Sequence, residues 1–125
     1  MDYLTLRKEV VEAGLLNRQY GYYAPKFIIT FGTLALSYVL LATVDSFVFQ
    51  LFNAAFLAFA IVQVGYMMHD AIHMQIFSDK WKNDFAGILT GGLTVNVSSS
   101  WGDAHLLHHK APKHVDLDPD VNMPI

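Results

Sequence analysis

Two long stretches in the first half of the chain contain no formally charged residue, and they predict its main helices. Residues 27–44 give eighteen such positions and residues 46–68 give twenty-three. At a rise of ~1.5 Å per residue the two helices would be about 27 Å and 34 Å long, against roughly 30 Å for the hydrocarbon core of a bilayer. Both can therefore span a membrane. A pair of buried helices in a soluble bundle is the weaker alternative, because 125 residues supply too few polar helices to surround them.

The link between the two stretches is short and lies around Asp45, so we expect an antiparallel transmembrane hairpin in an all-α membrane protein. The link carries no Lys or Arg, whereas both outer flanks are basic, which by the positive-inside rule places both ends in the cytoplasm. Tyrosines before the first stretch and a tryptophan after the second would form an aromatic belt on that side. The flanking basic residues are Arg7, Lys8, Arg18, Lys26, Lys80 and Lys82, and the belt residues are Tyr20, Tyr22, Tyr23 and Trp81.

The remaining segments are less apolar. Residues 1–19 carry a rough helical stripe, which is either a helix on the membrane surface or an ordinary short helix. Residues 79–84 predict a polar turn, and residues 85–101, interrupted by glycines and serines, predict an interfacial or partly re-entrant segment. From Lys110 onward, three prolines predict an extended loop. A cleavable signal peptide is not expected, because mostly polar residues precede the first apolar stretch.

Composition narrows the class of protein. The chain is 54% hydrophobic and 15% charged, against roughly 45–50% and about 25% for an ordinary soluble domain. Its length suits a single domain, and its net charge of -3 gives no basic surface for nucleic acid. The absence of cysteine excludes disulfides, thiolate zinc sites and iron–sulfur clusters. Any bound metal must therefore have nitrogen or oxygen ligands.

Five of the six histidines fall into two tight groups. The first group, in the sequence HDAIH, lies where the second apolar stretch ends, and the second group has the sequence HLLHH. Residues three or four apart share one face of a helix, so each group can direct its imidazoles toward one site. Both groups lie on the same predicted side of the membrane, and we expect them to converge at the hydrocarbon boundary. The candidate metal ligands are His69, His73, His105, His108 and His109.

The residue types leave several metals open. An imidazole-rich site suits iron, zinc, copper or nickel, and either group alone could be a solvated polar patch. The zinc-protease motif HExxH would require Glu where this chain has Asp70, and it would leave the second group without a role. More ligands than one zinc needs favour two metal ions, and two irons can activate dioxygen. Asp70 and Asp103 are either carboxylates that orient ligating imidazoles or solvated helix-end residues, and His114 is expected to be an exposed loop residue.

The two groups resemble a known family, the integral-membrane fatty acid desaturases. Residues 63–73 are similar to the family's first histidine box and the helix that leads into it. Residues 101–112, followed by Asp118-Pro119-Asp120, are similar to the second box and its tail. Upstream, residues 12–16 and 21–24 resemble bacterial acyl-CoA or acyl-lipid desaturases related to the front-end desaturases. The resemblance thus covers nearly the whole chain.

The resemblance implies a helical membrane fold with a cytoplasmic di-iron centre, which uses dioxygen and two electrons to place a cis double bond in a fatty acyl chain. The five histidines named above would be iron ligands, and Trp101 would either line the acyl channel or anchor the chain at the interface. Leu106 departs from the family, which usually has Asn there. The third box, Gln-x-x-His-His, and a second hairpin are also missing. Residues 1–125 are therefore expected to be the amino-terminal part of one desaturase domain and to be inactive alone, since five imidazoles are too few for two irons.

The resemblance also implies partners and a location. The substrate would be a fatty acyl chain carried on CoA, a carrier protein or a lipid. With no flavin or haem motif in the chain, electrons would come from a ferredoxin or a cytochrome b5-type protein with its reductase. The protein would lie in a membrane, as in the bacterial plasma membrane, with the histidine boxes on the cytoplasmic side. Two alternatives stay open: a di-iron lipid or alkane hydroxylase on the same scaffold, and a small two-span membrane protein that binds metal for sensing or delivery.

Overall fold

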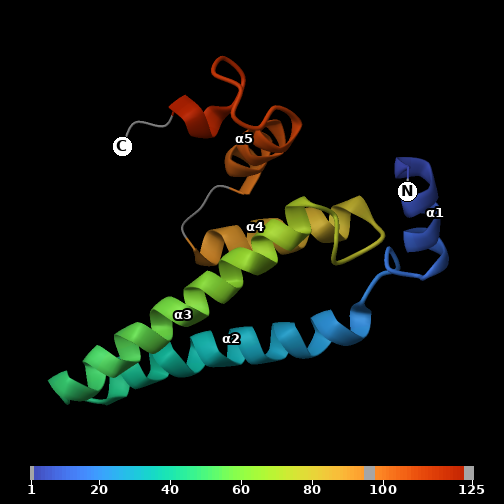
Figure 1. Ribbon diagram of the computed structural model, residues 1–125. Helices are drawn as coiled ribbons and strands as arrows, with labels where there is room; N and C mark the ends of the chain where they lie inside the picture. Colours follow the sequence, from blue (N-terminus) through green and yellow to red (C-terminus); the bar gives the residue numbers. More distant parts are fainter. Residues whose placement is uncertain (1, 95–97, 123–125) are drawn as a thin grey trace.

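The computed structural model describes residues 2–94 and 98–122, and within these ranges the chain forms helices and no strand. Two long helices, residues 20–43 and 47–72, form a hairpin. The helix of residues 80–93 packs beside the open end of this hairpin, and the helix of residues 98–110 lies beyond it (Figure 1). The prediction of an all-α fold is confirmed. The helices are α1 (Tyr3–Glu12), α2 (Tyr20–Thr43), α3 (Phe47–Ile72), α4 (Lys80–Leu93) and α5 (Ser98–Lys110), followed by a short 3-10 helix, η1 (Pro119–Asn122).

Helices α2 and α3 form the predicted pair, and each extends beyond its predicted span. α2 begins seven residues before position 27, and α3 continues four residues past position 68. Both are long and apolar enough to cross a membrane, and only 17% of the most apolar 18-residue window of each is buried. A helix in a soluble core would be mostly buried. These two expose large side chains such as Ile28, Phe52 and Phe59 instead. Such a surface is stable in lipid or against further protein, which supports a location in a membrane.

Buried polar side chains fix the antiparallel register of the hairpin. Near the bend, Gln50 donates hydrogen bonds from its amide to the carbonyl oxygens of Leu40 and Val44. One turn further along, the hydroxyl of Ser37 donates to Oδ1 of Asn53 at 2.9 Å, and the Asn53 amide donates back to the Ser37 carbonyl at 3.1 Å. Both side chains are buried. Because an unpaired polar group costs free energy in an apolar medium, these bonds disfavour a sliding of one helix along the other.

Helix α4 replaces most of what the sequence predicted for residues 79–101. The polar turn expected at 79–84 is wrong after its first residue, because Asp79 is the N-cap and the helix continues from Lys80. Lys80 and Asp84, at the start of α4, are exposed and pair with each other beside the exposed aromatic side chains of Trp81 and Phe85. The glycines of α4 do not interrupt it, and Gly87 is buried where α4 packs beside Ala71 of α3. Residues 95–97 of the predicted segment lie outside the described residues.

The loop between α3 and α4 is held by one buried amide. The side chain of Asn83 donates to the carbonyls of Phe77 and Asp79, and its Oδ1 accepts from the Phe77 amide. Ile76, within the loop, is fully buried against Ala71 and Ala86. This loop therefore fixes α4 against the end of α3 that carries the first histidine group.

The two ends of the chain differ from expectation. The predicted stripe over residues 1–19 is broken, because α1 ends at Glu12 and a glycine with positive φ, Gly14, turns the chain before Leu15 and Leu16. Within the described residues, α1 packs on no other helix. The tail after Lys110 is not extended: it turns, reaches η1 and packs back onto α5.

The hairpin register can be tested by removing its buried amide. Asn53→Ala should lower the free energy of unfolding in detergent or bicelles by about 0.6 kcal/mol or more, since hydrogen bonds between membrane helices contribute about 0.6 kcal/mol on average and at most about 1.7. Leu51→Ala is the matched control, because Leu51 lies on the same helix and is exposed. An Asn53 variant that unfolds no more readily than the Leu51 variant would contradict the assigned role.

Candidate metal centre

The first histidine group occupies the last turn of α3. His69 lies within the helix and His73 is its C-cap, where the chain turns through Met74 with a positive φ of 57°. Because the two residues are four positions apart, both imidazoles lie on one face of the helix, with ring centroids 4.5 Å apart. These two side chains thus project from the end of the hairpin that α4 supports.

The second group lies on α5, which crosses close to the end of α3. Gly102 is buried in α5, and a Cβ atom there would lie 3.3 Å from the side chain of Ile72. A side chain at this position would require the Ile72 side chain to shift, so the glycine suits the tight contact between the two helices. Three residues further along α5, His105 comes within 4.8 Å of His69 and 5.1 Å of His73, measured between ring centroids.

Four of the five candidate imidazoles converge, and the fifth, that of His108, lies in another group. One ring nitrogen from each of the four lies within 4.8 Å of the others. Nε2 of His105 is 3.0 Å from Nε2 of His73 and 3.1 Å from Nε2 of His109. The group consists of His69, His73, His105 and His109.

This spacing fits a metal ion. Nε2 of a neutral imidazole is either an N–H donor or an acceptor with one lone pair, so Nε2 of His105 either donates to one of its two neighbours or shares one lone pair between them. A cation placed between them would accept all the lone pairs. Two imidazole nitrogens at about 2.1 Å from a zinc-like ion, at right angles to each other, lie about 3 Å apart. The donor set therefore suits iron or another imidazole-binding metal.

The electrostatics of the group favour neutral rings. Partial burial lowers the pKa of His73, and the neighbouring His69 and His109 rings lower it further. Burial and the surrounding imidazoles lower the pKa of His105 in the same way. Since a metal binds the neutral imidazole, these shifts keep the lone pairs available at neutral pH.

His108, the fifth predicted ligand, lies in a second group beside the first. Its Nδ1 is 2.9 and 3.0 Å from the two carboxylate oxygens of Asp118, and 3.3 Å from Oδ2 of Asp120. These three residues form a separate set of potential ligands. The rings of His108 and His109 are 5.8 Å apart, so the two groups are adjacent. With Nδ1 turned to the carboxylate, Nε2 of His108 stays available for a metal.

Asp118 is the functional candidate that the sequence did not reveal. Its side chain is 1% exposed and accepts hydrogen bonds from His108 and from the amides of Lys113 and Asp120. Burial alone would raise the pKa of Asp118, but these hydrogen bonds outweigh it and hold the pKa below the ordinary value. The bond to Asp118 raises the pKa of His108. The Asp-Pro-Asp tail was the available signal, but no spacing rule connects it to His108 across the turn.

The other predicted site residues take different positions. Asp103 is exposed and lies in neither histidine group, whereas Asp70 contacts α2. Trp101 stacks on His105 with ring centroids 4.5 Å apart and planes 11° from parallel, so it covers one side of the imidazole group. His114 is an exposed loop residue, as predicted.

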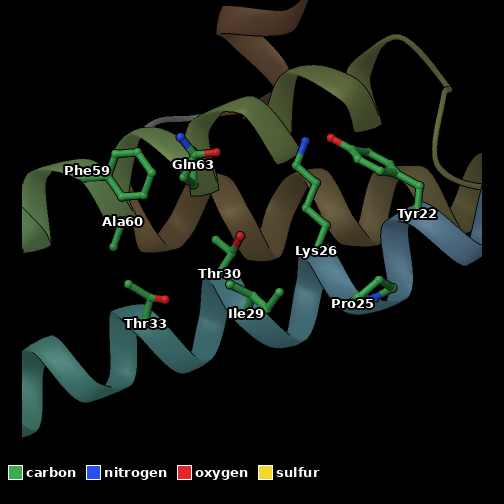
Figure 2. Close-up of a pocket in the computed structure, with 9 residues that line it drawn as sticks. All are labelled: Tyr22, Pro25, Lys26, Ile29, Thr30, Thr33, Phe59, Ala60 and Gln63. Atoms are coloured by element: carbon green, nitrogen blue, oxygen red, sulfur yellow. The ribbon is translucent and has the colours of Figure 1, made fainter.

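A separate groove runs along the hairpin between α2 and α3 (Figure 2). Its volume is about 370 Å³, and its lining is mostly apolar. Phe59, Ala60 and Gln63 of α3 form one wall, and residues 22–33 of α2 contribute the other. None of the five candidate ligands lines it, so the groove belongs to the exposed face of the hairpin and not to the imidazole site.

Comparison with known proteins agrees with this geometry. The sequence model described as "Fatty acid desaturase" matches residues 46–124, which include both histidine groups. The chain belongs to the fatty acid desaturase family. No solved structure matches it.

Its relatives include desaturases of plants and protists. The chain is 32% identical to a Delta(8)-fatty-acid desaturase of Helianthus annuus, over 96% of this chain and 26% of the relative. It is 30% identical to the Delta(8)-fatty-acid desaturase of Euglena gracilis, over 98% and 29%. An acyl-lipid (9-3)-desaturase of Physcomitrium patens is 27% identical, over 97% and 24%. The chain thus spans about a quarter of the length of these relatives.

The contact between His108 and Asp118 predicts a change in titration. In the metal-free protein, Asp118→Asn should lower the pKa of His108 toward its ordinary value, because the carboxylate that favours the protonated ring is gone. NMR titration of isotopically labelled histidine would measure the shift. Asp116→Asn is the control, since Asp116 is exposed and lies outside the His108 group. An unchanged His108 titration in Asp118→Asn would contradict the contact.

Proposed function

We propose that this chain forms part of a membrane fatty acid desaturase and supplies five of the ligands of its di-iron centre. The observation that carries the proposal is the convergence of imidazoles from α3 and α5, with Nε2 atoms 3.0 and 3.1 Å apart, in a member of this family. His69, His73, His105 and His109 would share one metal-binding group, and His108 would offer Nε2 beside it.

The reaction would remove one hydrogen from each of two neighbouring acyl carbons and leave a cis double bond. Two external electrons and two protons, together with the two hydrogens of the substrate, reduce one dioxygen to two waters. Bound iron would supply the activation of dioxygen. The residues of this chain would hold the metal through neutral imidazoles, shield one side of them with Trp101, and fix the ring of His108 through Asp118.

The same proposal covers partners and placement. The substrate would be a fatty acyl chain on CoA, a carrier protein or a lipid, and the relatives' names support the acyl-lipid and fatty-acid classes. A ferredoxin or a cytochrome b5-type protein with its reductase would deliver the two electrons. The basic flanks of the hairpin favour a cytoplasmic position for the histidines.

The ligand assignment predicts loss of metal. In the complete membrane protein, His73→Ala or His108→Ala should abolish or strongly reduce iron content and turnover, while membrane insertion is unchanged. Iron per chain, measured by elemental analysis after purification, and membrane fractionation test both parts. His114→Ala is the matched control, because this histidine is exposed and lies outside both groups. Normal iron content in the His73 variant would refute its role as a ligand.

The reaction type is tested by the product. Mass spectrometry of the acyl chains made by the complete protein should show a product lighter by two hydrogen atoms. A product heavier by one oxygen atom would establish hydroxylation on the same scaffold and overturn the proposed desaturation.

A further inference from the structure

The start of α2 holds the end of α3 by its polar side chains. The phenol of Tyr23 donates to Oδ2 of Asp70 at 3.2 Å, and the ammonium of Lys26 lies 3.4 Å from the same oxygen. Just before α2, the guanidinium of Arg18 donates to the carbonyl of Met74. Asp70 lies between His69 and His73 in the sequence of the first histidine group, so the contacts of Tyr23 and Lys26 are made next to a candidate ligand.

The contacts to Asp70 are shielded from solvent. The side chain of Lys26 is 17% exposed and that of Asp70 is 26% exposed. Tyr23 packs against the buried cluster that contains Ala71 and Ile76. By contrast, Lys80 and Asp84 form an ion pair on α4 whose side chains are 75% and 50% exposed. A shielded pair is screened less by water and salt, and breaking one partner leaves a poorly solvated charge.

The two donors act on one oxygen of Asp70 and leave the other facing the site. Both Tyr23 and Lys26 contact Oδ2, while Oδ1 lies 3.6 Å from Nδ1 of His69. Asp70 is absent from the group of four converging imidazoles. The carboxylate is thus turned toward α2 on one side and toward a ring nitrogen of His69 on the other.

We propose that Tyr23 and Lys26 are positioning residues that hold Asp70 beside His69 and keep its carboxylate out of the metal's ligand set. A ligating imidazole is oriented when its second nitrogen faces a carboxylate, and with Nδ1 facing Asp70 the nitrogen left for the metal is Nε2. A carboxylate released from α2 could rotate and compete as an oxygen ligand. The inference rests on the proposed function, because it assumes that the four imidazoles bind a metal.

The experiment compares metal retention in the complete membrane protein. Tyr23→Phe and Lys26→Met should each weaken the binding of iron(II) or cobalt(II), measured by competition with a coloured chelator, by about tenfold or more, as is typical of changes behind the ligands. The visible spectrum of bound cobalt(II), which reports the ligand set, should also change. Lys26→Arg should retain most of the metal binding, because it keeps the positive charge beside Asp70. Lys80→Met, which breaks the exposed pair on α4, is the matched control and should leave both readouts unchanged.

A double substitution separates a positioning role from an effect on general stability. If Tyr23 and Lys26 act through Asp70, then Lys26→Met should have little further effect in an Asp70→Asn background. Equal losses in both backgrounds would show a merely structural role and overturn the inference, as would unchanged binding and spectrum in both Tyr23→Phe and Lys26→Met. Failure of the unsubstituted protein to bind either metal is a different result, and it would overturn the proposed function itself.

Discussion

The rest of the structure is arranged around a close contact between imidazole nitrogens that converge from α3 and α5. Nε2 of His105 has Nε2 of His73 on one side and Nε2 of His109 on the other, each about one hydrogen-bond length away. A neutral ring has only one proton to share, and protonating several rings would place like charges side by side. The arrangement therefore suits a bound cation with imidazole ligands.

The rest of the described chain brings these nitrogens together and fixes them. His69 and His73 lie at the open end of the hairpin. Helix α4 packs on this end, and its buried Asn83 is hydrogen-bonded to the loop that joins α3 to α4. Gly102 suits the tight contact between α5 and Ile72, beside which the histidines of α5 reach those of α3. On the periphery, carboxylates restrain the rings: Asp118 contacts His108, and Asp70 lies between His69 and the donors of α2. These supports come from α2, α3, α4, α5 and the segment before η1, so the site depends on the packing of several elements.

The hairpin has its apolar surface turned outward, and this sets the environment of the site. Large side chains such as Phe52 and Phe59 are exposed along helices that are long enough to cross a bilayer. Between the two helices, the buried side chains of Ser37 and Asn53 are hydrogen-bonded to each other, and Asn53 also bonds to the Ser37 carbonyl. The imidazoles of His69 and His73 lie at the open end of this hairpin, in the last turn and at the C-cap of α3.

The sequence alone was enough to predict the helical hairpin and the five candidate ligands. Both predictions rest on local properties: the length of a segment without charges gives the length of a helix, and a spacing of three or four residues places side chains on one helix face. Prediction failed at residues 80–84, where charged residues at the start of a helix look like a turn, and after Lys110, where prolines look like an extended tail. Only the tertiary structure separated His108 from the other four histidines, gave Asp118 its partner and turned Asp70 toward α2. These outcomes arise from contacts between residues distant in the chain or across a turn, and such contacts are set by how the helices pack.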